Sequence, residues 1–147
     1  MDDLDFMDKA LALAREALED GEVPVGCVIV RGGDIVGQGR NRRETDKSAL
    51  AHAEVEAIRQ ACAALGGWRL WECTLYVTLE PCPMCAGAII NARIPTLVFG
   101  AREALTGSCG SVIDLFSENY GHRPAVYAGV LGEDCARLLK DFFQGRR

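Results

Sequence analysis

The sequence TLYVTLEPCPMCAGAIIN, residues 74–91, passes from a strand pattern to a helix pattern within a few residues. Residues 74–79 are β-branched, aromatic and apolar, which is typical of a buried strand. Pro81 and Pro83 end that strand, because proline has no N–H to donate to a neighbouring strand. Residues 84–91 then predict a helix. A helix that directly follows a buried strand is typical of α/β proteins.

Four elements are expected before this stretch. They are a helix, two strands and a second helix, over residues 6–18, 23–31, 34–41 and 52–65. Gly21 follows the first helical pattern as a stop signal. Gly32-Gly33 joins the two strands and predicts a tight hairpin, because glycine adopts positive φ angles at little cost.

Four more elements are expected after it. They are a strand, a short helix, another strand and a closing helix, over residues 96–101, 112–116, 125–129 and 133–144. The closing helix is predicted to turn its apolar residues inward, namely Cys135, Leu138, Leu139, Phe142 and Phe143. Strands that alternate with helices after an opening hairpin predict a mixed sheet with helices on its faces. With no repeat and no linker in the pattern, residues 1–147 are expected to form a single domain.

The composition is that of an ordinary globular protein, with 49% apolar and 25% charged residues in a chain of 147. No apolar run approaches the roughly 20 residues that a membrane-spanning helix needs. Three of the first five residues are aspartates, whereas a signal peptide begins with basic residues. We therefore expect a cytoplasmic protein with no membrane contact. The net charge of −5 argues against non-specific coating of nucleic acid, although it leaves room for a local basic patch.

Five of the seven cysteines fall into two groups. The odd total and the expected compartment argue against a paired disulfide framework. Cys27, Cys62 and Cys135 lie in apolar periodic segments, where cysteine behaves as a small buried hydrophobic residue. Cys82 and Cys85 differ, because they form a C-x-x-C pair at the start of a predicted helix.

His52 opens the predicted helix over residues 52–65, much as Cys82 and Cys85 open the next helix. One imidazole and two thiolates form a ligand set that suits Zn²⁺. Three protein ligands leave a fourth tetrahedral position for water, as catalytic zinc sites do. Two helix N-termini directed at one site would also stabilise thiolates. We predict one zinc ion per chain.

Glu54 lies two residues after His52 and need not bind the metal. Residues i and i+2 do not share a helix face, so both side chains converge only if the metal lies over the helix N-terminus. There the carboxylate can take a proton from a zinc-activated water, whose pKa falls toward about 7, and pass it to a ring nitrogen and a leaving amine. Hydrolytic removal of an amino group from an aromatic amidine requires these transfers. H-x-E followed by P-C-x-x-C is the pattern of zinc-dependent deaminases.

Two other interpretations apply to the same residues. A redox dithiol at Cys82 and Cys85 leaves His52 and Glu54 without a role, and Pro83-Met84 between the cysteines is unlike a thioredoxin-type site. A zinc-stabilised binding module has no use for a carboxylate beside an open metal position. A catalytic zinc site uses all four residues.

Longer segments extend the pattern over nearly the whole chain, from Phe6 to Phe143. They are GEVPVG (21–26), NR (41–42), AHAE (51–54), the opening stretch (74–87), VFGAR (98–102), GSCGS (107–111) and LLKDFF (138–143). With these segments the chain resembles the bacterial tRNA-specific adenosine deaminases of the cytidine deaminase superfamily. The resemblance implies a three-layer α/β/α fold with a five-stranded mixed sheet, and a homodimer.

The resemblance also implies the chemistry. His52, Cys82 and Cys85 correspond to the zinc ligands, and Glu54 corresponds to the proton shuttle. The implied reaction converts adenosine to inosine at the wobble position of a tRNA, and the implied partner is an anticodon stem-loop, that of an arginine tRNA. An anticodon loop already splays its bases, so presenting one to a pocket costs less than extraction from a duplex.

Four residues correspond to substrate-binding positions of the family. Asn41 matches the asparagine that hydrogen-bonds the substrate base, Val23 and Pro24 match the pocket wall, and Phe143 matches an aromatic residue near the RNA. An asparagine amide both donates and accepts, which suits the edge of a purine. From the residues alone, Asn41 can equally be a turn residue that ends the preceding strand.

Two positions depart from the family. Glu103 stands where an aspartate usually contacts the ribose of the target nucleotide, and Leu105 stands where a lysine is usual. The cations available for RNA are Arg40, Arg42, Arg43, Lys47, Arg102 and the pair Arg146-Arg147. Each of them can instead belong to a solvated surface of mixed charge, and His122 is expected in a surface turn. The alternative function is deamination of a free base such as guanine or cytosine, which needs no basic surface.

Overall fold

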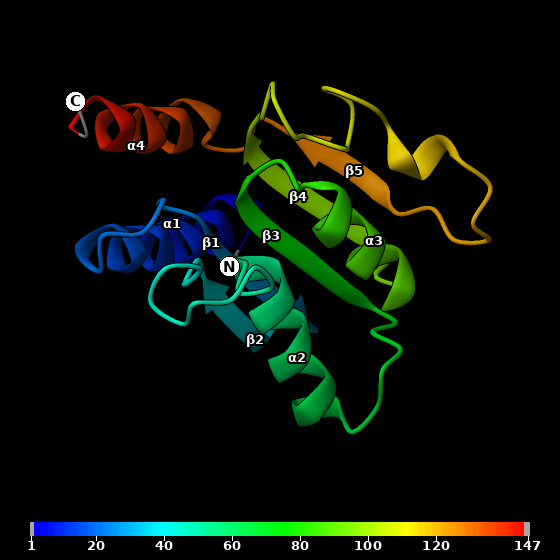
Figure 1. Cartoon of the computed structure of the whole chain (residues 1–147). Helices are drawn as coiled ribbons and strands as arrows, with labels where there is room; N and C mark the ends of the chain where they lie inside the picture. The colour runs from blue at the N-terminus through cyan, green and yellow to red at the C-terminus, as the bar shows by residue number, and fades with distance from the viewer. Residues whose placement is uncertain (1, 146–147) are drawn as a thin grey trace.

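The computed structural model describes residues 2–145, which form one five-stranded sheet with helices on both faces (Figure 1). The strands are β1 (Gly26–Arg31), β2 (Asp34–Arg40), β3 (Cys73–Leu79), β4 (Thr96–Ala101) and β5 (Ala125–Ala128). The helices are α1 (Asp3–Glu19), α2 (Ala53–Leu65), α3 (Pro83–Asn91) and α4 (Gly132–Gln144), with a 3-10 turn η1 (Leu115–Ser117). The predicted α/β fold is confirmed.

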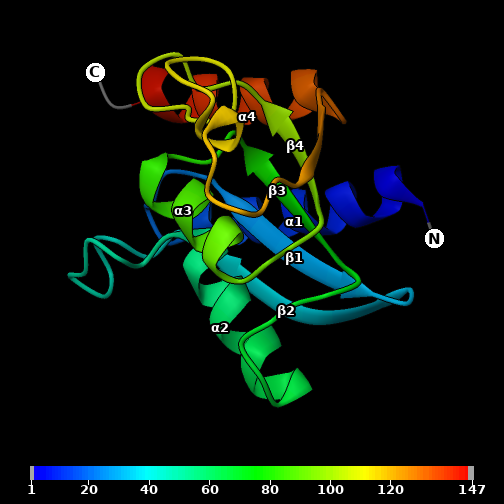
Figure 2. The same ribbon diagram turned by 90° about the vertical axis from the view of Figure 1, so that its right-hand side faces the viewer.

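The sheet is mixed, with the strand order β2-β1-β3-β4-β5. β1 is antiparallel to both of its neighbours, while β3, β4 and β5 run parallel to one another. Helices α1 and α4 cover one face and α2 and α3 cover the other, which gives three layers (Figure 2).

The layers follow from the alternation of apolar residues along the buried strands. In β1, Cys27 and Ile29 pack in the core beneath α2 and α3. The intervening Val28 and Val30 pack in the second core, against α1 and α4. Because its apolar residues enter both cores, β1 is buried on both faces of the sheet.

Local signals set several element boundaries. The hairpin between β1 and β2 turns at Gly32 and Gly33, whose φ angles are 58° and 85°, as the sequence predicts. Helix α1 begins earlier than the apolar pattern, because Asp2 and Asp5 form a capping box at its start. No helix within residues 2–145 is long and apolar enough to cross a membrane.

Two sequence expectations about the C-terminal half are wrong. The predicted helix over residues 112–116 is absent, and only the turn η1 forms there, with the side chain of Asp114 accepting a hydrogen bond from the backbone N–H of Phe116. In α4, Phe142 is buried, but Phe143 is 57% exposed instead of facing the core. Adjacent helical residues point about 100° apart, and here that rotation turns Phe143 away from the side on which Phe142 is buried.

The chain places three loops at one end of the sheet. β2 ends at Arg40 before the loop that leads to α2, β3 ends at Leu79 before α3, and β4 ends at Ala101 before the loop that leads to η1. Hydrogen bonds connect them, for example from Ser108 N to the carbonyl oxygen of Pro81, at 2.9 Å. The candidate site lies at this end.

Candidate active site

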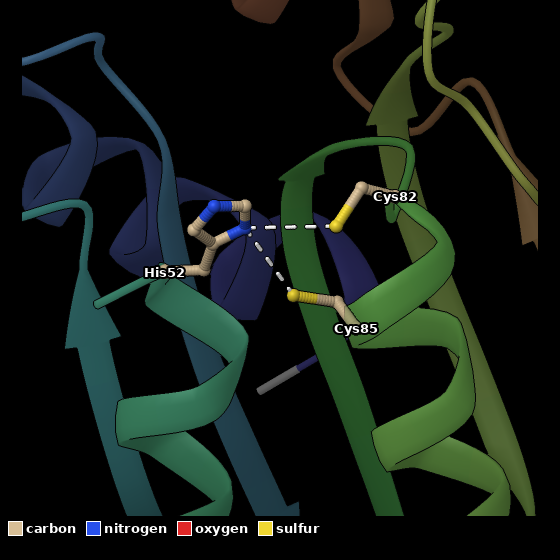
Figure 3. Close-up of side chains that lie close together, drawn as sticks. All are labelled: His52, Cys82 and Cys85. Atoms are coloured by element: carbon tan, nitrogen blue, oxygen red, sulfur yellow. Dashed lines mark hydrogen bonds between the residues drawn. The ribbon is translucent and has the colours of Figure 1, made fainter. Parts of the chain in front are cut away.

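The three predicted metal ligands lie together at the N-termini of two helices (Figure 3). His52 is the N-cap residue of α2, and Cys82 is the N-cap residue of α3. Pro83 occupies the first turn of α3, where its missing N–H is harmless, and Cys85 follows in the same turn. The ligand atoms of the three residues all lie within 4.8 Å of one another.

The distances within this cluster fit a tetrahedral zinc ion. His52 Nδ1 lies 3.6 Å from Cys82 Sγ and 3.5 Å from Cys85 Sγ. Zinc bonds of about 2.3 Å to sulfur and about 2.1 Å to nitrogen, at the tetrahedral angle, place these atoms about 3.6 Å apart. The donor set and its spacing therefore fit Zn²⁺ without rearrangement.

The electrostatics of the cluster favour a thiolate even without a metal. A hydrogen bond with Cys85 and a second one with His52 lower the pKa of Cys82 to about 4. The N-terminus of α3 adds positive potential at the same place. A site that already stabilises negative charge on sulfur is prepared for a divalent cation.

Glu54 lies beside the cluster in the first turn of α2, and only 4% of it is exposed. Burial raises the pKa of its carboxyl group to about 7 in the metal-free protein. A carboxyl group with such a pKa can both accept and return a proton near neutral pH.

Above the cluster lies a pocket of about 250 Å³. Its wall contains His52, Glu54 and Cys82 together with four of the predicted substrate-binding residues, namely Val23, Asn41, Glu103 and Phe143. Pro24 is buried but does not line the pocket, whereas its neighbours Val23 and Val25 do, as alternating side chains of an extended segment would.

Asn41 lines the pocket, and its side chain also holds the turn that follows β2. Its side-chain Nδ2 donates to the carbonyl oxygen of Val23 at 3.2 Å, and its Oδ1 accepts from the backbone N–H of Arg43 at 3.1 Å. These bonds fix the amide at the pocket wall. One N–H and one lone pair of the amide are not used by them.

Glu103 and Phe143 form part of the pocket rim. The Oε1 atom of Glu103 accepts from the backbone N–H of Leu105 at 3.0 Å, which folds the side chain back over its own loop. The ring of Phe143 stands edge-on to Phe142, with the ring centroids 5.2 Å apart. Leu105, 85% exposed, lies on the same rim.

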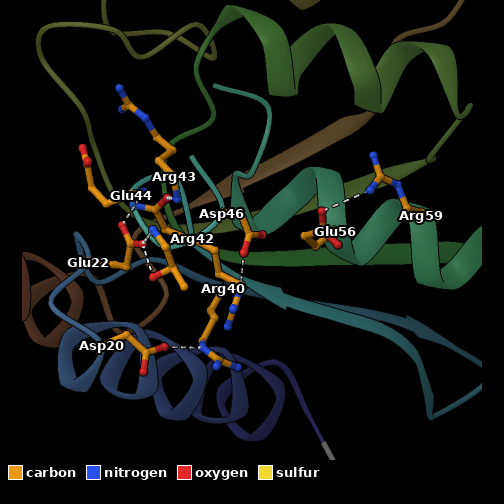
Figure 4. Close-up of polar contacts among 11 residues, drawn as sticks. Asp20, Glu22, Arg40, Arg42, Arg43, Glu44, Asp46, Glu56 and Arg59 are labelled. Atoms are coloured by element: carbon orange, nitrogen blue, oxygen red, sulfur yellow. Dashed lines mark hydrogen bonds and ion pairs between the residues drawn. The ribbon is translucent and has the colours of Figure 1, made fainter. Parts of the chain in front are cut away.

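Acidic neighbours neutralise part of the predicted basic cluster (Figure 4). Arg40 pairs with Asp20 at 3.1 Å, and Arg42 pairs with Asp46 at 3.2 Å. Arg43 makes no side-chain hydrogen bond or ion pair within residues 2–145, and it lines the pocket. Lys47 is exposed on the same loop. Arg102 lies over the ring of Phe99, and Arg146-Arg147 fall outside the described residues.

The remaining cysteines and the second histidine behave as expected from their surroundings. All seven cysteines are free thiols, and Cys27 and Cys135 are fully buried while Cys62 is partly buried. His122 directly follows the bend at Gly121 and is partly buried, and its Nε2 is 2.7 Å from the carbonyl oxygen of Ile94.

Sequence reasoning missed two buried carboxylates near the pocket, Glu22 and Glu80, each only 2% exposed. Glu22 accepts hydrogen bonds from Glu44 and Thr45, and Glu80 accepts from the loop after β4. The signal in the sequence is a lone acidic residue beside buried apolar neighbours, in EVPV and TLEP. A lone charge of that kind needs several donors when it is buried.

An imidazole and two thiols at two helix starts, with a buried carboxylate beside them, form the arrangement of the zinc-dependent deaminases. The MafB19-like deaminase family matches residues 1–147. The tRNA-specific adenosine deaminase of Bacillus subtilis (strain 168) is 46% identical over 143 residues, which are 97% of this chain and 89% of the relative.

Two solved structures extend the comparison. A tRNA A34 deaminase, studied for A-to-I editing at the wobble position of transfer RNA, has a TM-score of 0.88 and 44% identity, covering 91% of this chain and 98% of its own. The guanine deaminase of Bacillus subtilis has a TM-score of 0.65 and 37% identity, covering 99% of this chain and 94% of its own. The chain belongs to the MafB19-like deaminase family and to the family of the bacterial tRNA-specific adenosine deaminases.

Proposed function

We propose that the protein is a zinc-dependent hydrolase that converts adenosine to inosine at the wobble position of a tRNA. The observation that carries the proposal is the ligand cluster of His52, Cys82 and Cys85 with the buried Glu54 beside it at the floor of one pocket. The similarity to tRNA-specific adenosine deaminases indicates that the substrate is an adenosine of a tRNA.

His52, Cys82 and Cys85 would hold the zinc ion. When bound, the ion supplies activation of the attacking water, whose pKa falls toward about 7. Glu54 would take a proton from that water and deliver it to the ring nitrogen next to the carbon under attack. It would then take the second proton from the hydroxyl group added to that carbon and pass it to the amino group, which leaves as ammonia while the carbonyl of inosine forms. One buried carboxylate beside the metal ligands can serve all of these steps.

The pocket wall positions the base for this chemistry. Asn41 presents its remaining N–H and lone pair to the edge of the purine, while Val23 contacts the ring. Glu103 faces the ribose, and Phe143 offers an exposed ring for stacking of a neighbouring base. Residues that are fixed before binding lose little entropy when the substrate arrives.

The net charge of −5 is compatible with an RNA loop as substrate. An anticodon loop needs a complementary pocket and a few cations, because its bases are already unstacked. Arg43 at the pocket and Lys47 on the same loop can supply those cations.

Several finer assignments belong to the same proposal. We infer that the tRNA is an arginine tRNA, that residues 1–147 act as one deaminase domain in the cytoplasm, and that the protein works as a homodimer. The resemblance to the family supports these inferences. The half-exposed Trp68 and Trp71 are large apolar side chains of the kind that a subunit interface covers.

A second candidate function is deamination of free guanine. The guanine deaminase of Bacillus subtilis is similar over nearly the full length of the chain. The experiment that separates the two functions compares ammonia release by the zinc-loaded protein from an anticodon stem-loop with a wobble adenosine, from free guanine and from free cytosine. The proposed function predicts release from the stem-loop alone, and release from guanine or cytosine alone contradicts it.

A further inference from the structure

The segment GSCGS, residues 107–111, forms part of the loop between β4 and η1, and the chemistry above gives it no role. The first part of this loop, residues 103–106, contributes Glu103, Leu105 and Thr106 to the pocket wall. The arrangement of residues 107–111 is explained by one buried side chain, that of Glu80.

The carboxylate of Glu80 accepts four hydrogen bonds from the loop. Its Oε1 accepts from the backbone N–H of Glu103 at 3.0 Å and from the hydroxyl of Ser111. Its Oε2 accepts from the backbone N–H groups of Cys109 and Ser111, both at 3.0 Å. Donors from both ends of the loop thus converge on a side chain that is only 2% exposed.

The loop approaches this carboxylate so closely that glycine is required at residue 107. A Cβ atom on Gly107 would lie 2.5 Å from the carboxyl carbon of Glu80 and 2.4 Å from the backbone oxygen of Glu103. Real Cβ atoms do not make such contacts, and one of these two atoms belongs to the backbone. The loop is therefore shaped around Glu80.

Glu80 also connects the loop to the metal site. It lies two residues before Cys82, and its backbone N–H donates to the carbonyl oxygen of Ala101, at the end of β4. The carbonyl oxygen of the next residue, Pro81, accepts from Ser108 N. One set of hydrogen bonds therefore connects the loop at the pocket rim with the end of β3, which leads to the predicted metal ligand Cys82.

We propose that Glu80 is a positioning residue that fixes the loop of residues 103–111, and with it Glu103 and Leu105, at the spacing from the zinc site that the substrate nucleotide requires. This inference rests on the proposed function and adds a determinant of substrate binding outside the zinc chemistry. Backbone donors directed at a buried carboxylate hold a loop more rigidly than donors to water, because loosening them leaves the charge unsolvated.

The test compares Glu80→Gln with the wild-type enzyme. An amide has one acceptor oxygen and turns its NH₂ group toward donors, so at least one backbone contact is lost, while the hydroxyl of Ser111 can accept from the NH₂ group instead. We expect KM for the stem-loop to rise by about tenfold or more, with a smaller change in kcat and with zinc content retained. Ser111→Ala removes only the hydroxyl donor and is the milder variant, with KM rising by about two- to fivefold.

Asp114→Asn is the matched control, because it removes a negative charge from an exposed residue near the same loop without touching Glu80. Loss of negative charge by itself strengthens RNA binding, so a charge effect lowers KM, whereas loss of positioning raises it. Backbone amide hydrogen exchange gives a readout without substrate. Glu80→Gln should accelerate exchange at residues 103, 109 and 111.

Unchanged exchange at these residues, or an unchanged KM in both Glu80→Gln and Ser111→Ala, overturns the inference. Loss of zinc from Glu80→Gln with no effect of Ser111→Ala also overturns it, because Glu80 would then support only the metal ligands. If the wild-type enzyme deaminates no stem-loop, the proposed function fails, and the exchange measurement still decides whether Glu80 holds the loop.

Discussion

Glu54 is the residue whose replacement separates zinc binding from turnover. Glu54→Ala removes the proton shuttle and leaves His52, Cys82 and Cys85 in place. We expect kcat to fall by about 10²–10⁴-fold, the usual contribution of a positioned general acid–base, while metal analysis still finds one zinc per chain. Turnover near the wild-type rate would show that another group moves the protons.

Two neighbouring arginines provide a comparison for RNA binding. Arg43 lines the pocket without an acidic partner in residues 2–145, whereas Arg40 is paired with Asp20. Arg43→Ala should raise Kd for the stem-loop and reduce the slope of log K against log salt by about 0.7–1, the contribution of one phosphate contact. Arg40→Ala is the control and should change neither quantity. Equal effects of the two substitutions would contradict this assignment.

At the scale of elements, the loop between β2 and α2 depends on the buried carboxylate of Glu22. This group accepts from the backbone N–H groups of Glu44 and Thr45, and from the hydroxyl of Thr45. Burial alone would raise its pKa, but the hydrogen bonds from Thr45 and Glu44 outweigh burial and lower the pKa below the usual 4.5. The contribution of Glu22 to stability is therefore present above pH 4.5 and is lost as the pH falls through the lowered pKa.

Glu22→Gln should lower the free energy of unfolding by about 1.5–3 kcal/mol at pH 7, the range for hydrogen bonds to a charged group. Denaturant unfolding of both proteins at pH 7 and near pH 3 measures the effect. The difference between them should shrink at the lower pH, because below the usual pKa of 4.5 the unfolded chain takes up a proton that the folded carboxylate resists. A difference that is independent of pH would mean that the charge of Glu22 does not hold the loop.

The helices and strands could be predicted from the sequence where the apolar pattern extended over many residues, as in α1, β1 and β3. Residues 112–116 gave a false helix because Val112 and Ile113 are apolar, yet both are about half exposed in a loop that is shaped around a distant carboxylate. The residues that donate hydrogen bonds to Glu80 lie 23 to 31 positions further along the chain, and no local sequence pattern reports such contacts. The predicted metal ligands could be found from the sequence, because each lies at a helix start, which a local pattern does report.

Over the whole molecule, the zinc ion should contribute to stability as well as to chemistry. Its ligands come from α2 and α3, two helices that pack on the same face of the sheet, so the ion links separate parts of the core. Removing zinc with a chelator, or replacing a ligand by Cys85→Ala, should lower Tm, because metal binding energy adds to folding energy. An unchanged Tm after verified loss of zinc would contradict this coupling.

The central claim is that this site deaminates one adenosine of a tRNA anticodon loop. The most direct measurement incubates the zinc-loaded protein with two stem-loops, one with adenosine at the first anticodon position and one with the adenosine moved by one position, and detects inosine by mass spectrometry after nuclease digestion. We expect inosine only in the first stem-loop, and none with Glu54→Ala. No inosine in either stem-loop, together with ammonia released from free guanine by the same preparation, would contradict it.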